Sequence, residues 1–236
     1  MHLKKVILLS EKYPTTTHYP FNQTVFQKTG SVAFCSPVTF FQGENGSGKT
    51  TLLEALAYKC GIHIWRRSEG TRFEFNPYEK ALHRFISIEW ADGFVPGSFF
   101  SSQLFNDFSQ NLDEWAVADP EMLKYFGGKS LITQSHGQSL MAYFKARYRI
   151  KGLYLMDEPE TALSPGSQLE LLKVLRDMGR AGHAQFIIAT HSPILLACPD
   201  AQIYSFDKTP VTLIEYEETE NFKIYENFIK DRNKYI

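Results

Sequence analysis

The chain has 236 residues, of which 43% are hydrophobic and 22% are charged, and its formal net charge is −1 at neutral pH. A chain of this length and composition can bury a sizeable core as one large α/β domain, or as a main body with a small lobe. Its near-zero net charge excludes binding to nucleic acids or membranes through overall charge alone, although a neutral total leaves room for a local basic patch.

The cysteines and the N-terminal segment indicate the cellular compartment. Cys35, Cys60 and Cys198 are odd in number, widely spaced and set among apolar residues, which argues against a disulfide framework or a zinc site. The apolar run after Met1 is too short for a signal peptide, and no stretch approaches the length of a membrane span. We therefore expect a cytoplasmic protein that is neither exported nor inserted into a membrane.

The N-terminal third is predicted to contain two strands and a helix. Residues 3–10 and 31–41 read as strands, separated by a polar connection from Tyr13 to Asn22. An amphipathic helix is expected over Thr51 to Cys60, with Gly61 as the residue that ends it.

A glycine-rich loop lies between the apolar run Val38 to Gln42 and this helix. Its residues are Gly43, Glu44, Asn45, Gly46, Ser47, Gly48, Lys49 and Thr50, which fit the P-loop spacing in a strand–loop–helix context. The glycines allow a tight turn whose N–H groups point at phosphate oxygens, and the start of the helix adds further donors. Lys49 is expected to neutralise the β- and γ-phosphates, Thr50 to bind Mg²⁺, and Thr51 to reach the α- and β-phosphates. An ordinary glycine-rich turn is the alternative interpretation.

The pattern changes in the middle of the chain. From Ile62 to Asp92, short aromatic and β-branched runs at 72–75 and 84–90 alternate with turns, which predicts an antiparallel addition to the core. Residues 93–134 show only helical tendencies, near Phe105 to Leu112 and near Pro120 to Phe126.

Regular patterns return after residue 138. In chain order they predict a helix from Gln138, a buried parallel strand Gly152–Asp157, a helix from Ser164 to Gly179, a strand Gln185–Thr190, a short helix after Ser192, a strand Ile203–Phe206, and a terminal amphipathic helix that carries Phe222, Tyr225, Phe228 and Ile229. No internal repeat or sustained heptad is present, so no coiled coil is expected.

Polar residues stand where two of the predicted strands end. Asp157 closes an apolar strand and Glu158 follows it, so one carboxylate can bind Mg²⁺ while the next orients or deprotonates an attacking water. His191 follows the neighbouring strand, where a neutral imidazole can hydrogen-bond a γ-phosphate or that water. The alternatives are a surface turn before Pro159 and a structural histidine.

These motifs, in their order along the chain, resemble those of ABC-type ATPases. The segments are Gly43–Thr50, Ser135–Gln138, Leu153–Pro159, Ala162–Pro165 and Thr190–His191. More narrowly, the chain resembles the small standalone predicted ATPases akin to the SMC, Rad50 and RecF heads. The resemblance implies a P-loop α/β fold, with a mostly parallel core sheet flanked by helices, an antiparallel β addition and a small helical lobe. The corresponding lobes are residues 1–92, 93–150 and 151–236 of a single domain.

The resemblance also implies a composite site in an ATP-bound homodimer. Ser135, Gly137 and Gln138 match the signature segment that reaches the nucleotide of the other copy, while His136 departs from the usual glycine. Residues 162–164 match the loop at the dimer seam, known as the D-loop. A metal-binding glutamine, the Q-loop residue, is expected between the P-loop and the signature segment. Gln103 is the candidate and Gln110 its competitor.

Other positions near the site are less clearly marked. Gln42, just before the first glycine, is expected to end a strand rather than bind a ligand. Stacking on adenine needs an aromatic ring or an arginine near the P-loop, and Phe21, Trp65 and Arg66 all qualify.

Three functions are compatible with these residues. The main reading is an ATPase that uses ATP and Mg²⁺, closes as a head-to-tail dimer and acts as a switch on a partner protein or nucleic acid. The alternatives are the nucleotide-binding subunit of an ABC transporter and a slow-turnover ATP-binding scaffold. Without a nuclease motif, coiled-coil arm or zinc hook in the sequence, the biological process stays open.

Overall fold

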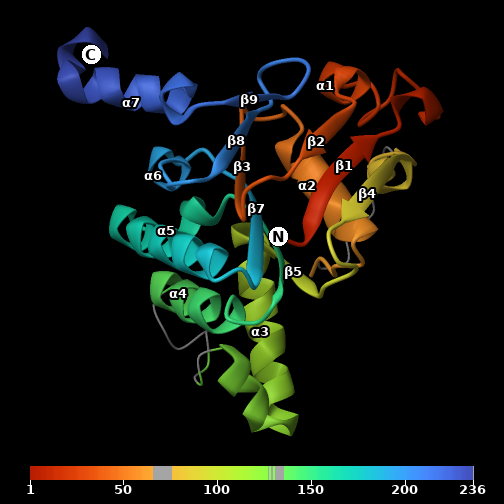
Figure 1. Cartoon of the computed structure of the whole chain (residues 1–236). Coiled ribbons are helices and arrows are strands. Elements are labelled where there is room, and N and C mark those ends of the chain that lie inside the picture. The colour runs from red at the N-terminus through yellow and green to blue at the C-terminus, as the bar shows by residue number, and fades with distance from the viewer. Residues whose placement is uncertain (66–75, 127, 129, 131–135, 236) are drawn as a thin grey trace.

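A computed structural model of the whole chain describes residues 1–65, 76–126, 128, 130 and 136–235 (Figure 1). Side chains at 103, 104, 106–108, 120, 125, 126 and 136 also fall outside the described part. Two sheets organise the fold. The larger one has the strand order β5-β6-β7-β3-β8-β9, and the smaller one has the order β2-β1-β4.

The larger sheet is parallel apart from its last strand, β9, which pairs antiparallel with β8. Its strands, in spatial order, are β5 (Gly97–Ser101), β6 (Gly152–Asp157), β7 (Ala184–Ala189), β3 (Val38–Gln42), β8 (Gln202–Ser205) and β9 (Thr212–Ile214). All residues of β3 and β7 are buried, as expected for parallel strands that are covered on both faces.

The two faces of this sheet supply two separate hydrophobic cores, because side chains alternate along each strand. One face packs against α2 (Lys49–Lys59) and the smaller sheet, through Phe41, Leu153, Leu155, Ile187 and Ala189. The other face packs against α4 (His136–Arg147), α5 (Pro165–Arg180) and α6 (Pro193–Leu196), through Phe40, Tyr154, Met156, Phe186 and Ile188. Figure 1 shows these helices on opposite sides of the sheet.

The smaller sheet is antiparallel and consists of β1 (Leu3–Leu8), β2 (Ser31–Ala33) and β4 (Ile86–Trp90). It confirms the predicted antiparallel addition, although the expected strand at 72–75 lies outside the described residues. A short helix, α1 (Thr24–Lys28), connects β1 with β2.

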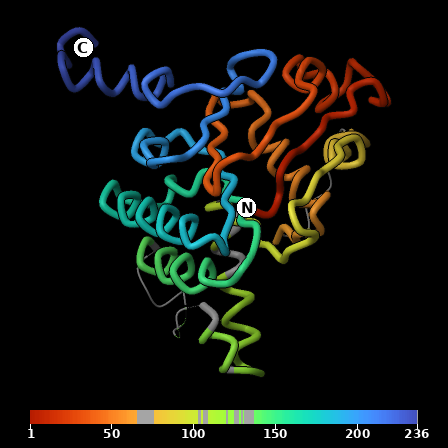
Figure 2. The backbone as a smooth tube through the Cα atoms, in the orientation of Figure 1, coloured from red at the N-terminus to blue at the C-terminus, as the bar shows by residue number. Residues whose placement is uncertain are grey.

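Two elements extend away from the sheets. The helix α3 (Ser102–Ala118) follows β5 and, with the 3₁₀ segment 120–126, forms the projection at the bottom of Figure 2. The terminal helix α7 (Glu220–Lys230) lies at the opposite end of the molecule and confirms the predicted amphipathic helix. Among the described residues, no helix has the length and apolarity that crossing a membrane requires.

The predicted strand over residues 31–41 is wrong, because the chain breaks there and enters a different sheet. Residues 34–37 separate β2 from β3, and Pro37 has no N–H with which to continue a ladder. The side-chain oxygen of Gln202 accepts hydrogen bonds from the N–H groups of Cys35 (2.6 Å) and Ser36 (3.0 Å). A side chain far along the chain thus replaces a strand partner.

The predicted end of the long helix at Gly179 is also wrong. Gly179 lies inside α5, where a Cβ would come within 3.3 Å of Pro37, so a glycine allows helix and strand to approach closely. The left-handed residue after this helix is Gly182, with a φ of +79°. By contrast, Gly61 follows α2 with a φ of +65°, as expected for a residue that ends a helix.

Candidate active site

The loop between β3 and α2 is held in a shape that requires glycine. Gly48 stands directly before α2 with a φ of +102°, a left-handed conformation that other residues rarely adopt. A Cβ at this position would lie 2.7 Å from the ring of Phe26 and 2.8 Å from Oε1 of Gln23. The helix α1 therefore packs directly against the P-loop, and its close approach excludes any side chain at Gly48.

Lys49 lies at the centre of the loop and is almost fully buried, with 4% of its surface exposed. Its Nζ donates hydrogen bonds to the carbonyl oxygens of Gly43 (2.6 Å) and Glu44 (2.9 Å). Burial lowers the pKa of Lys49, whereas the nearby carboxylates of Glu158 and Asp207 raise it. The loop that would bind a phosphate thus also holds the ammonium group of Lys49.

Two side chains outside the motif brace the loop. The side-chain amide of Gln23 donates a hydrogen bond to the carbonyl of Gly46 (2.9 Å). The carboxylate of Asp207, which follows β8, accepts a hydrogen bond from the N–H of Glu44 (2.7 Å). The sequence analysis missed both residues, since neither has a local signal that links it to the P-loop.

The hydroxyl of Thr50 and the carboxylate of Asp157 meet across the site. Thr50 is in the first turn of α2, and Asp157 ends β6. The Oγ1 of Thr50 donates a hydrogen bond to Oδ1 of Asp157 at 2.9 Å. Among the described residues, no cluster of three His, Cys, Asp or Glu side chains could hold a metal. A hydroxyl and one carboxylate nevertheless fit Mg²⁺, which usually completes its shell with water and substrate phosphate.

Asp157 carries an electrostatic cost in the ligand-free protein. Burial raises the pKa of Asp157 to about 6, the hydrogen bond from Thr50 and the charge of Lys49 lower it, and Glu158 raises it further. Because the pKa is higher in the folded state than in the unfolded state, the contribution of Asp157 to stability falls as the pH rises from about 4 to 6. Above this range, the folded chain holds a poorly solvated carboxylate.

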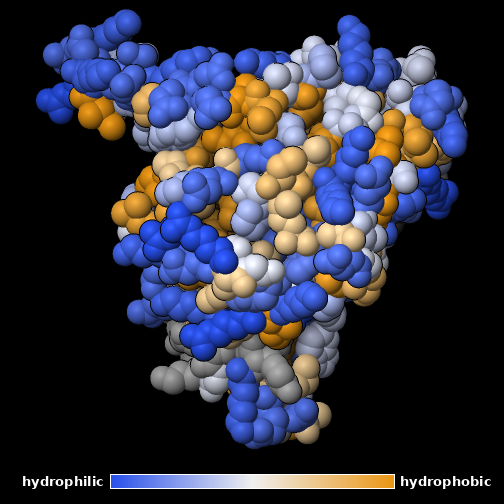
Figure 3. All heavy atoms as spheres, viewed as in Figure 1, coloured by the Kyte–Doolittle hydropathy of each residue, from blue (hydrophilic) through white to orange (hydrophobic). Residues whose placement is uncertain are grey.

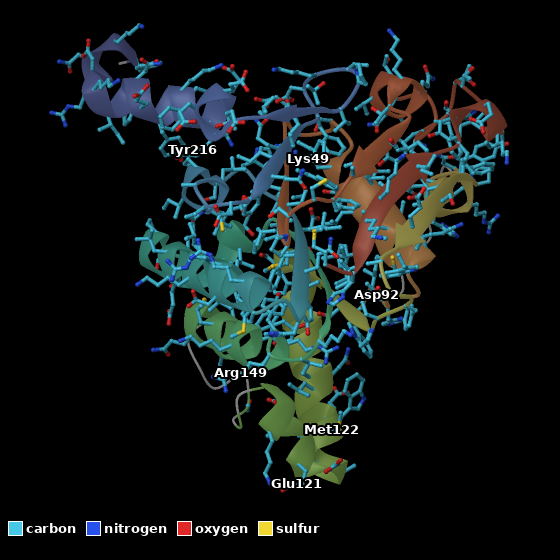
Figure 4. All side chains as sticks on the ribbon, in the orientation of Figure 1. Lys49, Asp92, Glu121, Met122, Arg149 and Tyr216 are labelled. Atoms are coloured by element: carbon cyan, nitrogen blue, oxygen red, sulfur yellow. The ribbon has the colours of Figure 1, made fainter. Side chains whose placement is uncertain are left out.

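We therefore expect Asp157→Asn to raise the melting temperature of the ligand-free protein by about 2–4 °C at pH 7.5, and by about half as much at pH 5. The variant keeps an oxygen that can accept from Thr50 and removes the buried charge. Thermal unfolding at both pH values measures the effect, with the exposed Asp92→Asn as a control expected to show no shift (Figure 4). A lower melting temperature for Asp157→Asn at pH 7.5 would contradict this account.

Glu158 and His191 form the other side of the site. Glu158 has a left-handed backbone, with φ of 45° and ψ of 55°, which is uncommon for a residue other than glycine and often marks functional positions. Its Oε1 lies 3.6 Å from Nε2 of His191, and about a third of each side chain is exposed. Burial and the charge of Lys49 lower the pKa of His191, so its ring is neutral at physiological pH.

Two family models match parts of the chain. The model described as "AAA domain" matches residues 22–85, which include the P-loop. The model described as "AAA domain, putative AbiEii toxin, Type IV TA system" matches residues 140–197, which include Asp157, Glu158 and His191. Each match spans less than half of the chain. No curated protein matches the sequence.

Solved structures match nearly the whole chain. CbiO1 from Clostridium perfringens, part of the ABC transporter complex CbiONQ, matches with a TM-score of 0.52 and 18% identity, over 99% of this chain and 98% of that chain. An SMC head bound to the C-winged helix domain of ScpA matches with a TM-score of 0.51 and 14% identity, over 92% and 99% of the two chains. The chain has the fold of these ABC-type ATPases. The predicted fold class is thereby confirmed.

In this ABC-type fold, the signature segment lies apart from the P-loop of the same chain. Ser135 lies outside the described residues, whereas Gly137 and Gln138 are in the first turn of α4. Among the described residues, a Cβ at Gly137 would meet only Ser167 Oγ and the carbonyl of Ala162 within 4 Å. Gly137 is therefore next to the D-loop segment rather than the phosphate-binding loop.

The backbone places Gln103 near the end of β6. It comes two residues after Ser101, which pairs with Asp157 in the register of β5 and β6. The side chain of Gln103 is not among those described. Gln110 is about two turns further along α3.

Gln42 is buried at the end of β3, with its amide 3.4 Å from Asp207, as expected of a strand-end residue.

The aromatic residues proposed for adenine do not all have accessible rings. Phe21, one of three possible residues of which none was favoured, is fully buried and packs against the ring of Phe85, so its ring has no free face for a base. The ring of Trp65 packs against Trp115 on α3, and Arg66 lies outside the described residues. The hydroxyl of Tyr19, a residue that the sequence analysis did not single out, lies 2.5 Å from Thr51 Oγ1 at the edge of a cavity of about 210 Å³.

Proposed function

We propose that this chain binds and hydrolyses ATP in the presence of Mg²⁺, and that it does so as a head-to-tail homodimer. The observation that carries the proposal is the convergence of Lys49, Thr50, Asp157, Glu158 and His191 at one edge of the sheet, where β3, β6 and β7 end. In open α/β sheets, ligands bind at the carboxyl ends of the strands.

Each residue has a role that its position supports. The N–H groups of residues 43–51 and the ammonium group of Lys49 bind the phosphates. Thr50, Asp157 and Gln103 hold Mg²⁺, which neutralises the charge that develops on the phosphoryl oxygens. Glu158 orients the attacking water and accepts its proton, and the neutral ring of His191 hydrogen-bonds the γ-phosphate.

A second copy would complete the site. Ser135, Gly137 and Gln138 are proposed to reach the ATP on the P-loop of the partner, with the D-loop between the two sites. Gly137 leaves space at the start of α4, and that helix start can point its unpaired N–H groups at a phosphate. The partial exposure of Glu158 and His191 leaves them accessible to a second chain.

Tyr19 is our candidate for the residue that stacks on adenine. The residue is 37% exposed, and its hydroxyl contacts Thr51, which follows the proposed Mg²⁺-binding threonine. An aromatic face next to a phosphate site can bind a base through stacking without selecting it by hydrogen bonds.

Two uses of this ATPase are equally compatible with the fold. In the first, which we propose, a cytoplasmic dimer acts as a switch on a partner protein or nucleic acid. In the second, the chain is the nucleotide-binding subunit of an ABC transporter, the class of complex to which CbiO1 belongs. Copurification with a membrane protein would favour the second.

The test of the proposed function measures hydrolysis and assembly together. Purified protein should release phosphate from ATP with Mg²⁺ and should sediment as a dimer with saturating ATP and as a smaller species without it. Measuring phosphate release in the same assay with added DNA or RNA tests whether nucleic acid is the partner. Absence of both nucleotide binding and hydrolysis would overturn the proposal.

A further inference from the structure

The backbone of His191 is held from two sides by side chains of other elements. Its N–H donates a hydrogen bond to Oε1 of Glu160 (2.6 Å), which lies between β6 and α5. Its carbonyl oxygen accepts a hydrogen bond from the side-chain amide of Asn221 (2.5 Å) in the first turn of α7. The position of the imidazole therefore depends on two segments that are distant in the sequence.

The start of α7 is anchored beside the same segment. The hydroxyl of Tyr216 donates to the carbonyl of Pro193 (3.0 Å), and the Tyr216 ring packs on Phe222, with 4.8 Å between ring centroids. Thr219 is fully buried and caps the helix by accepting the N–H of Phe222. Figure 4 shows Tyr216 where the chain enters α7.

The rest of α7 packs little against the domain. None of its residues is buried, and a groove of about 1020 Å³ is lined by α5, α6 and α7 side chains, with His191 at its wall. Its exposed apolar side chains include Ile224, Tyr225 and Ile229, and Figure 3 shows apolar atoms along the lower edge of this helix. The first turn is therefore the main connection between α7 and the site.

We propose that Asn221 is a positioning residue for His191, and that α7 sets the position of the imidazole relative to Glu158 through this hydrogen bond. The inference rests on the proposed function, since it assigns His191 to the γ-phosphate. The Nε2 of His191 is buried and has no hydrogen-bond partner among the described residues, and the Glu158 carboxylate lies 3.6 Å from it, so a small movement of the ring changes its distance to Glu158. Displacement of α7 moves the carbonyl to which Asn221 is bonded, and with it the ring.

Asn221→Ala tests the inference, because it removes the donor and leaves the rest of α7 intact. The matched control is Asn227→Ala on the same helix, whose amide donates instead to the carbonyl of Lys223 (2.8 Å) within α7. We expect kcat for ATP to fall about tenfold in Asn221→Ala, with KM and nucleotide affinity changed less than about twofold. Asn227→Ala should match the wild type in all three.

A second readout does not depend on hydrolysis. The ring C–H resonances of His191, observed by NMR in the ligand-free protein, should shift in Asn221→Ala and stay unchanged in Asn227→Ala. Unchanged resonances, an unchanged kcat in an active enzyme, or equal losses in both variants would overturn the positioning role. A wild-type protein that neither binds nor hydrolyses ATP would instead overturn the proposed function, while the NMR comparison still decides whether α7 positions the ring.

Discussion

Glu158→Gln should lower the turnover of ATP by about a hundredfold to ten-thousandfold while it preserves ATP binding. General-base catalysis contributes a factor of this size, and a neutral amide cannot accept the proton of the attacking water. The substitution keeps the size and shape of the side chain. It also keeps the carbonyl of residue 158, to which the hydroxyls of Ser102 and Thr161 both donate at 2.9 Å. The left-handed turn after β6 is therefore retained.

The same variant should accumulate as an ATP-bound dimer. Hydrolysis would normally reopen the two heads, so a chain that binds ATP but cannot cleave it stays closed. Removal of a negative charge that faces the phosphates strengthens this effect, because Glu158 is close enough to Lys49 and His191 to raise the pKa of each. Light scattering coupled to size-exclusion chromatography, with and without ATP and Mg²⁺, measures the change in mass.

The matched control is Glu11→Gln, which makes the same chemical change at an exposed position before the P-loop. It should retain the turnover and the assembly behaviour of the wild type. If the Glu158→Gln variant stayed monomeric at saturating ATP and Mg²⁺, this would contradict the head-to-tail dimer. Turnover within a few-fold of the wild type would contradict the role of Glu158 as the base.

The strand-end residues of the site could be predicted because their positions follow from the sequence alone. Asp157 and His191 each come directly after an apolar run, and parallel strands bring their carboxyl ends to one edge. The P-loop was predictable for the same reason, since its glycines and Lys49 lie within a few residues of each other. Contacts over such short separations are encoded in the local order of residue types.

The missed features depend on contacts across long separations. Three residues that contact the site lie far from their partners in the sequence: Gln23 by 23 positions, Asp207 by 163 and Asn221 by 30. No local sequence pattern predicts such contacts. The strand β5 was missed for a different reason. It contains only two apolar residues, Phe99 and Phe100, because in the described structure it pairs only with β6 at the sheet edge. An edge strand needs fewer apolar residues than a central one.

Lys49→Ala should lower the affinity for ATP by about a hundredfold or more, equivalent to about 3 kcal/mol, because it removes the only cation of the loop that contacts the phosphates. The ligand-free fold should persist. The Nζ of Lys49 donates to the carbonyls of Gly43 and Glu44, and in the variant these carbonyls can accept hydrogen bonds from water. The variant also loses a buried charge, whose pKa is lowered by desolvation.

Calorimetric titration with ATP and Mg²⁺ measures this affinity, and circular dichroism verifies that the fold is intact. Lys59→Ala provides the matched control, because it removes the same side chain from the other end of α2, where Lys59 is exposed. If Lys59→Ala binds as the wild type does and Lys49→Ala fails to bind, the effect belongs to the loop rather than to the net charge of the chain. If Lys49→Ala bound ATP as tightly as the wild type, the phosphates could not lie against Gly43–Thr50, and the assignment of the P-loop would be wrong.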